Sequence, residues 1–307
     1  MANYKQFSEL YNDVSRAIGD LGNQQRIDEI KAVINMVYLQ EIMKCDDLNP
    51  CLWFLHYFDD SQKCKSSVSI TGISQANPGV VSCVHSFVAG DIVQIAGVVG
   101  MTEVNNRIFV VGTVVAGVSF QILTLDGANV NTTSFTAWSS GGTVYHRGIS
   151  LASGYEQLLI GAWHGYSGEI KPIDEHELEK TTSYYDPGNS GRPTRYLQKK
   201  YFTAAGVEAN RVLWFPLPDS TYQLRAWLEK QPDRLSGDTD VPILPFRYHD
   251  AITSGAIMRM MKYPEIQIEN AVVWPWIFKN HIENLRTENR NYWRKFNQDN
   301  RSAPFLR

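Results

Sequence analysis

Histidines, cysteines and paired carboxylates are the side chains of this chain that could bind a metal or carry out acid–base chemistry. None of the seven histidines lies four residues from another histidine or a cysteine, the spacing that puts two ligands on one helix face. The spacings between the cysteines, six, thirteen and nineteen residues, fit neither a CxxC pair nor a zinc knuckle. We therefore expect reduced, structural thiols and no metal or other cofactor. The cysteines are Cys45, Cys51, Cys64 and Cys83.

Catalytic motifs of fixed spacing do not occur in the sequence either. It contains no GxxxxGK[ST] phosphate loop, no GxGxxG after a strand, no HExxH and no GxSxG. Gly188-Asn189-Ser190-Gly191 resembles a nucleophile elbow only superficially, because it lies in a loop-like stretch rich in proline and glycine. A dispersed carboxylate pair of the glycosidase kind stays open as an alternative, since such acids are distant in sequence. The favoured interpretation is a protein that is not an enzyme.

The C-terminal segment has the residue types best suited to recognition. Between residues 283 and 307, six basic residues stand against three acidic ones, with aromatic residues interleaved. Arginine and aromatic residues are enriched among interface anchors, so we expect this segment to dock onto a partner protein. An ordinary basic helix end and phosphate contacts with nucleic acid are the alternatives. The expected docking residues are Tyr292, Trp293, Arg294, Lys295, Phe296, Phe305, Leu306 and Arg307.

Composition sets the general class of the protein. The chain has 307 residues, a net charge of −3, 43% hydrophobic residues and 12% aromatic residues. This near balance of charge argues against a strongly basic nucleic-acid binder and against an acidic disordered chain. The first residues do not predict a secretory signal. The uncharged stretch 108–125 is punctuated by glycines, so it predicts two buried strands and no membrane span.

A change in composition marks an inserted domain in the middle of the chain. Residues 65–147 hold 10 of the 22 glycines but only six charged residues. Short apolar runs alternate there with turn signals such as Asn77-Pro78-Gly79, which predicts a small β-sandwich or barrel. Phe135 and Trp138 are expected to be exposed beside the turn at 139–142.

The flanking residues predict helices at both ends and strands between them. Helical periodicity predicts an N-terminal hairpin of two helices, with Gly22 as the C-cap of the first. Pro275 is expected to kink the last helix, and residues 296–307 to stay flexible until something holds them. The candidate strands are 52–58, 196–202, 211–215 and 222–229, and the candidate helices are 153–163, 245–262 and 268–293.

The predicted fold class is therefore α+β. An N-terminal helical hairpin and C-terminal long helices form a helical core, accompanied by a β-sheet region and an inserted all-β domain. The expected boundaries are 1–64 for the first part of the core, 65–147 for the insert, 148–295 for the second part of the core, and 296–307 for a C-terminal docking tail.

The insert carries a recognisable series of residues. In order, these are Thr71-Gly72-Ile73, Asn77-Pro78, His85-Ser86-Phe87-Val88-Ala89-Gly90-Asp91-Ile92-Val93, Gly97 and Gly100-Met101-Thr102-Glu103-Val104-Asn105-Asn106. This series resembles the first catalytic-cysteine half-domain of ubiquitin-activating enzymes, a small β module also found in phage structural proteins. The resemblance covers about 80 residues. In those enzymes this half-domain makes no thioester, and the adenylating parts are absent here, so the resemblance implies a recognition or spacer module.

A second series of residues lies in the flanks. It consists of Ile34-Asn35-Met36-Val37-Tyr38, Leu217-Pro218-Asp219-Ser220-Thr221-Tyr222-Gln223-Leu224-Arg225-Ala226-Trp227, Pro242-Ile243-Leu244-Pro245-Phe246 and Tyr248-His249-Asp250-Ala251-Ile252. Followed by a long helix with a basic tail, this order resembles the head–tail adaptor (connector) proteins of short-tailed bacteriophages.

This resemblance implies a homo-oligomeric ring in the neck of the virion, made in the host cytoplasm and expected to match the twelve-fold portal protein. The ring would extend the DNA channel and serve as a platform for tail nozzle and tail-fibre proteins. The C-terminal segment would reach the portal. Double-stranded DNA would pass without sequence-specific binding, and a slightly acidic chain suits that passage because a basic lumen would hold phosphates.

A receptor- or glycan-binding tail protein is the alternative from another functional class. In that interpretation the β domain is an adhesin, and Phe135 and Trp138 make the contact.

Overall fold

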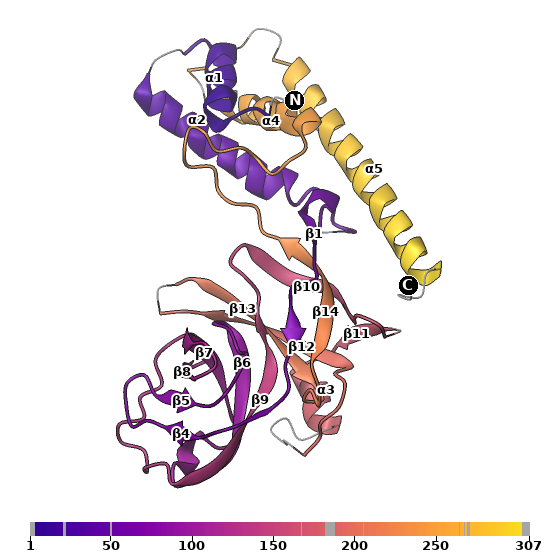
Figure 1. The fold of residues 1–307 in the computed structure, drawn as a ribbon. Coiled ribbons are helices and arrows are strands. Elements are labelled where there is room, and N and C mark those ends of the chain that lie inside the picture. The colour runs from indigo at the N-terminus through magenta and orange to yellow at the C-terminus, as the bar shows by residue number, and fades with distance from the viewer. Residues whose placement is uncertain are drawn as a thin grey trace. The chain divides into compact units, whose positions relative to one another are not determined.

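The helical patterns and the strand patterns of the sequence lie largely in two different parts of the molecule. The computed structural model describes residues 4–20, 23–49, 51–166, 168–181, 188–204, 206–263, 265–266, 268 and 271–302. The chain divides into a helical unit, residues 1–57 with 230–303, and a β unit, residues 58–229 (Figure 1). The fold is α+β, as the sequence predicts.

The helical unit begins with the predicted hairpin of helices. α1 (Phe7–Ile18) is followed by α2 (Gln24–Met36), which continues into a π-helical segment, η1 (Val37–Ile42). α1 ends at Gly19, whose φ of 74° supplies the left-handed C-cap. The prediction of Gly22 as the cap was therefore wrong, and Gly22 itself lies outside the described residues.

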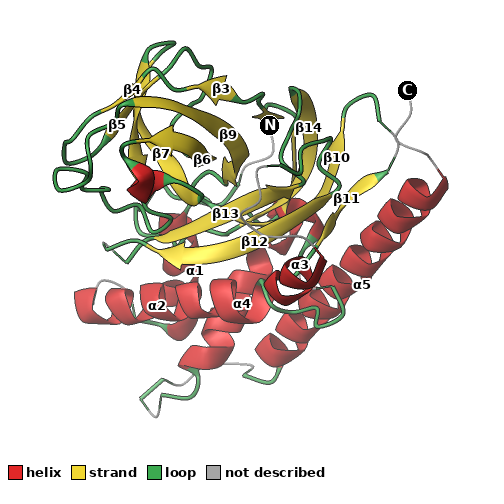
Figure 2. Cartoon of the chain, turned by 90° about the horizontal axis from the view of Figure 1, so that it is seen from below, coloured by secondary structure: helices red, strands yellow, loops and turns green. Residues whose placement is uncertain are grey.

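α4 is the central helix of this unit. A 3₁₀ turn, η4 (Phe246–Tyr248), leads into α4 (His249–Met260), which packs against α1, α2 and α5 and is buried along most of its length (Figure 2). A Cβ atom added at Gly255 would lie 2.6 Å from Val37 Cγ1 and 2.8 Å from Phe278 Cε2. Neighbouring helical segments therefore approach α4 closely at Gly255.

α5 (Val273–Ser302) is the longest helix, with 30 residues. Pro275 lies in its first turn, where a backbone N–H has no intrahelical acceptor to lose, so the predicted kink was wrong. The helix also continues through residues 296–302, which were expected to be flexible. Residues 303–307 lie outside the described part of the chain.

The β unit is built on one large mixed sheet. Its order is β1-β14-β10-β11-β12-β13-β9-β6-β7-β8-β5-β4, with β2 beside β14 and β3 beside β9. The strands are β1 (His56–Asp59), β2 (Lys63–Cys64), β3 (Val68–Ser69), β4 (Gly72–Ile73), β5 (Val80–Ser82), β6 (Asp91–Val99), β7 (Arg107–Val115), β8 (Ser119–Leu123), β9 (Ser140–Ser150), β10 (Tyr155–Trp163), β11 (Glu169–Pro172), β12 (Arg195–Phe202), β13 (Glu208–Phe215) and β14 (Tyr222–Lys230), and the short helices are η2 (Trp53–Leu55), η3 (Thr102–Val104) and α3 (Glu175–Thr181).

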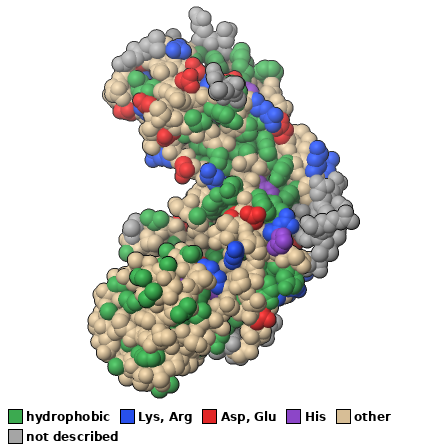
Figure 3. All heavy atoms as spheres, viewed as in Figure 1, with side chains coloured by type: hydrophobic (Ala, Val, Ile, Leu, Met, Phe, Trp, Pro, Cys, Tyr) green, Lys and Arg blue, Asp and Glu red, His purple; other side chains and the backbone are tan. Residues whose placement is uncertain are grey.

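Three hydrophobic clusters of described residues lie on this sheet, and β9 takes part in two of them; the third joins Ile92, Leu197, Leu213 and Phe215 to Ile173 and Leu178. β3 to β9 surround one core, whose largest members are Phe109 and Phe120. β9 to β14 pack around a second core that contains Trp163 and Trp214. On the face shown in Figure 3, charged side chains are sparse over the first of these regions, in keeping with the composition of residues 65–147.

Most predicted strands are confirmed, and two predictions need correction. β12, β13 and β14 correspond to the expected strands, and β7 and β8 account for the uncharged stretch 108–125. The segment 153–163 is the strand β10 and no helix, because it pairs with β14 and β11 and contains Gly161, a weak helix former. In 52–58, only the last part is a strand, since η2 precedes β1. Within the described residues, no helix combines the length and apolar content needed to cross a bilayer.

The variant Gly255→Ala tests the helix crossing. In an uncrowded helix, alanine in place of glycine stabilises by about 1 kcal/mol. Here the added methyl group would crowd η1 and α5, so we expect the free energy of unfolding to fall by about 1–3 kcal/mol, measured by urea denaturation.

The control for this test is Gly191→Ala, whose new methyl group would meet Pro216 Cγ at an ordinary 3.6 Å. We expect it to change stability by less than about 0.5 kcal/mol. An unchanged or raised stability of Gly255→Ala would contradict the packing described above.

Candidate functional site

Of the predicted docking residues, those that the structure describes lie in the C-terminal half of α5. Tyr292, Trp293 and Phe296 are half-buried, whereas Arg294 and Lys295 are exposed. The prediction thus divides into aromatic side chains that contact the same chain and basic side chains that point to solvent. The remaining predicted residues, Phe305, Leu306 and Arg307, lie outside the described residues.

The three aromatic rings surround His56. Their centroids lie 5.7 Å (Tyr292), 5.3 Å (Trp293) and 4.7 Å (Phe296) from the imidazole. The Tyr292 hydroxyl and His56 Nδ1 share a hydrogen bond, and Trp293 Nε1 donates to the Cys51 carbonyl at 2.7 Å. Burial lowers the pKa of His56, so the ring is neutral at pH 7. These aromatics therefore hold α5 against segment 51–56.

One turn before Trp293, the buried side-chain amide of Asn289 adds to the contact of α5 with the N-terminal part of the chain. Asn289 is fully buried. Its Nδ2 donates to Asp46 Oδ2 at 3.0 Å and to the Asn49 carbonyl at 2.9 Å, and its Oδ1 accepts from the Trp53 backbone at 3.0 Å. Three of the four hydrogen bonds available to the amide are made. Arg286 Nε adds a bond to the Cys45 carbonyl.

Asp46 is the charged group at the centre of this contact. Burial works against its ionisation, but hydrogen bonds from Asn289, the Leu48 backbone and Asn49, together with the charge of Arg290, outweigh burial and lower its pKa. Arg290 Nε and Nη2 each lie 3.4 Å from Asp46 Oδ1. The carboxylate therefore holds segment 46–49 in the shape that receives α5.

Sequence reasoning missed Asp46 and Asn289. A signal was present, because Asn289 continues the apolar stripe of α5 that runs through Phe278, Ile282 and Leu285 at spacings of three and four. A polar residue in the phase of a buried stripe requires a hydrogen-bonding partner. The identity of that partner, over 240 positions earlier, is not encoded in any spacing.

The far end of the site is a basic stretch of α5, about two turns before the helix ends at Ser302. Arg294 and Lys295 are exposed on the last part of α5 whose side chains are described. Arg294 Nη2 donates to Asn291 Oδ1 at 2.8 Å, one turn earlier on the same helix. The arrangement can present positive charge from a rigid support.

The β unit contains a buried ionic cluster within the motif of the insert. Lys65 Nζ is paired with Asp91, and His146 Nε2 lies 3.5 Å from Asp91 Oδ1. Burial opposes the charge of Asp91, but bonds from His146 and Lys65 lower its pKa. The dominant effect on His146 is also burial, which lowers its pKa despite the neighbouring carboxylate. The cluster ties the entry to the insert, at Lys65, to β6 and β9.

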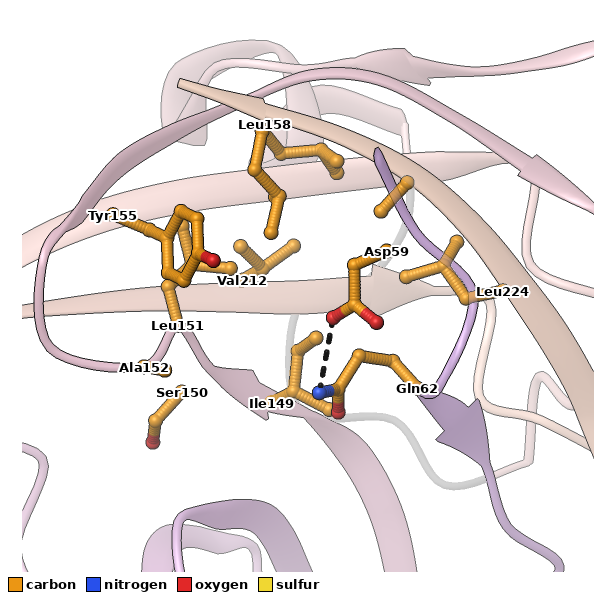
Figure 4. A pocket seen from close by; sticks show the side chains of 12 residues that line it. Asp59, Gln62, Ile149, Ser150, Leu151, Ala152, Tyr155, Leu158, Val212 and Leu224 are labelled. Atoms are coloured by element: carbon orange, nitrogen blue, oxygen red, sulfur yellow. Dashed lines mark hydrogen bonds between the residues drawn. The ribbon is translucent and has the colours of Figure 1, made fainter. Parts of the chain in front are cut away.

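One small cavity lies in the second core of the β unit. Figure 4 shows Tyr155, Leu158, Val212 and Leu224 in its wall, near a hydrogen bond of 3.3 Å from Gln62 to Asp59. Its volume is about 20 Å³. This is room for about one water molecule, far less than the several hundred Å³ of a usual ligand pocket.

The cysteines are buried free thiols, as the sequence predicts. Burial raises the pKa of Cys45 and Cys83 to about 11 and that of Cys64 to about 12, so they are poor nucleophiles at pH 7. Within the part of the chain that is described, no group of three or more histidine, cysteine or acidic side chains is arranged to hold a metal ion.

The expected exposure of Phe135 and Trp138 was wrong. Both are half-buried and pack against the core of the insert. Trp138 Nε1 also donates to the Gly141 carbonyl at 3.1 Å, which folds the tryptophan back onto the turn. Little ring surface is therefore left for the sugar contact that an adhesin would need.

Comparison with known proteins identifies the insert. Residues 76–147 match the family model of the ubiquitin-activating enzyme E1 FCCH domain. The resemblance drawn from the sequence of the insert is thereby confirmed. The match covers less than a quarter of the chain and concerns this module alone. No curated protein matches the chain.

The variant Asp46→Asn tests the electrostatics of the α5 contact. Because the folded-state pKa is lowered, Asp46 stabilises the fold above its unfolded pKa of about 4, and this stability is lost as the pH falls through the folded value. We expect the substitution to lower the free energy of unfolding by about 1–3 kcal/mol at pH 7, with a smaller further loss than wild type on acidification to pH 3.

Urea denaturation at the two pH values measures both effects. The matched control is Asp47→Asn, because Asp47 is the exposed neighbour in the same loop, and it should leave stability at pH 7 within about 0.5 kcal/mol of wild type. Equal stability of Asp46→Asn and Asp47→Asn would show that the buried carboxylate contributes nothing.

Proposed function

We propose that this protein is a virion structural protein, the head-to-tail adaptor of a short-tailed bacteriophage. Copies form a ring beneath the portal protein, extend the DNA channel, and provide the attachment platform for tail nozzle and tail-fibre proteins. It acts by shape, without making or breaking covalent bonds, and double-stranded DNA passes through without sequence-specific binding.

The observation that carries the proposal is the clamped end of α5. Ordering a flexible docking segment costs conformational entropy, so a segment that leaves from a rigid support binds more tightly. Asn289, Trp293 and Phe296 anchor α5 to segment 45–56, while Arg294 and Lys295 stay exposed within this anchored stretch. A basic stretch held in this way suits a helix that leads toward a neighbouring protein.

Contacts between the adaptor-like segments also support the proposal. Tyr38, at the end of the first segment, is buried, and its hydroxyl accepts a hydrogen bond of 3.1 Å from the Ile243 backbone. His249 Nε2 bonds to the Leu244 carbonyl at 2.9 Å, and its Nδ1 accepts from the Lys5 backbone at 3.2 Å. Three of the four segments, which are individually weak signals, are thus parts of one packed unit, whereas residues 217–227 belong to the β unit.

The FCCH-type module fits the same role as a spacer or recognition element. Its few charged residues are largely used internally, as in the cluster around Asp91. The module gives the adaptor a second protein surface, which we assign to contacts with tail proteins.

Removal of residues 303–307 tests portal docking by the C-terminal segment. This truncation keeps all of α5 and removes Phe305, Leu306 and Arg307. We expect binding to the portal protein of the same virus to weaken at least about tenfold, or 1.4 kcal/mol, with circular dichroism and melting temperature unchanged. Removal of residues 296–307 should in addition lower the melting temperature, because Phe296 packs on His56.

The control is removal of residues 1–3 at the opposite end of the chain, which should leave portal binding intact. Undiminished portal binding by the protein that lacks residues 303–307 would refute the docking role. Electron micrographs of portal rings mixed with the full-length protein test the function as a whole. We expect an added coaxial ring, and portal rings that stay bare would overturn the proposal.

A further inference from the structure

The start of α5 exposes an uncharged apolar surface. Val272 and Trp276 are 86% and 65% exposed, and Val273 is exposed between them. No charged residue occurs from Ala271 to Phe278. We call Val272, Val273 and Trp276 the Trp276 patch.

The start of α5 is packed on one face and exposed on the other. Phe278, two positions later, faces the opposite side of α5 and is buried against Gly255 of α4. The helical unit therefore uses one face of α5 for its own core and leaves Trp276 on the other. Tryptophan is the residue type most enriched among interface anchors, and contiguous exposed apolar residues mark interaction surfaces.

A second apolar surface lies at the start of α4. Tyr4 and Phe246 are both exposed and meet edge to face, with ring centroids 6.4 Å apart. Both rings also contact the buried His249, at 5.9 and 5.7 Å. We call Tyr4 and Phe246 the Phe246 patch.

The two patches lie at opposite ends of one helix pair. α4 and α5 run antiparallel, because Arg247 pairs with Glu288 at one end and Gly255 meets Phe278 further along. Trp276 precedes Glu288 by twelve residues, which corresponds to about 18 Å along α5. One apolar patch could receive an unrelated partner, but two separated patches on one unit are what a head-to-tail contact between copies requires.

Charged residues described beside each patch are paired within the chain. Beside the Phe246 patch, Lys5 Nζ lies 2.9 Å from both Asp13 and Asp250, and Arg247 is paired with Glu288. Beside the Trp276 patch, Lys279 lies 3.8 Å from Glu283. Both surfaces are therefore apolar centres whose charged neighbours Lys5, Arg247 and Lys279 are paired. They suit each other better than they suit a charged partner such as nucleic acid.

We propose that the Trp276 patch of one copy packs against the Phe246 patch of the next copy. The contact is heterologous, so its repetition around an axis closes a ring. This inference rests on the proposed function and names the surface through which its subunits join.

The variant Trp276→Ser tests this contact, with Phe202→Ser as the matched control. Phe202 is 67% exposed on β12 and belongs to neither patch. Sedimentation velocity with the full-length protein, alone and with portal rings, measures assembly. We expect Trp276→Ser to weaken self-association about 30-fold or more, as for a hot-spot residue, and Phe202→Ser to assemble like wild type. Circular dichroism and melting temperature establish that each variant is folded.

A mixing experiment tests the pairing of the two patches. Trp276→Glu and Phe246→Lys should each fail to assemble alone, because each places a charge against an apolar surface. Mixed in equal amounts, they should assemble again. Alternating copies then meet through a Glu–Lys pair at one contact and through native patches at the next.

The outcomes separate this inference from the proposed function. Normal rings of Trp276→Ser, or no recovery on mixing, would overturn the pairing and leave the adaptor function standing. Wild-type protein that forms no ring, alone or on portal rings, would overturn both. Loss of portal binding by Trp276→Ser with unchanged self-association would assign the patch to the portal and overturn the contact between copies.

Discussion

A single buried amide sets the register of the longest helix in this protein. An apolar stripe alone could slide by one turn and still bury its side chains. The Asn289 amide has no such freedom, because a buried polar group that loses its partners costs about 1–3 kcal/mol, and its partners, Asp46, Asn49 and Trp53, lie on one short segment. The direction in which Arg294 and Lys295 point follows from that register.

Buried charge has a similar role at the entrance of the FCCH-type module. Asp91 at the start of β6 is bonded to Lys65, at the start of the insert, and lies close to His146 near its end. The pairing of β6 with β9 is irregular between Ile92 and Val93, so one extra residue of β9, Arg147, is accommodated there. The guanidinium of Arg147 lies 4.3 Å from the Phe215 ring of β13. Ionic and cation–π contacts thus connect the module to the strands beyond it.

The local sequence pattern correctly predicted those helices and strands whose buried residues recur at the period of the element itself. It failed where the conformation of a segment depends on partners that are distant in the sequence. The period-two alternation of β14 and the helical stripe of α1 are visible in the sequence because each buries one face. β10 was missed because its conformation depends on pairing with β11 and β14. In the candidate site, residue type marked Tyr292 and Trp293 as contact-forming. Their partners, His56 and the Cys51 carbonyl, belong to a segment more than 230 residues away, so the sequence could not show that the contact is internal.

Because β3 and β9 are neighbours, the module could be replaced by another domain without changing the host sheet. Val68 lies opposite Val144, and Ser69 opposite Thr143, so the chain enters and leaves the module at adjacent points of one ladder. A graft at these four positions needs no new linker, because the ends of a replacement domain only have to be close together. Beyond them, β9 continues to Ser150 and pairs with β13, so that part belongs to the host sheet. Recombination at this point would place a different module on the same host sheet.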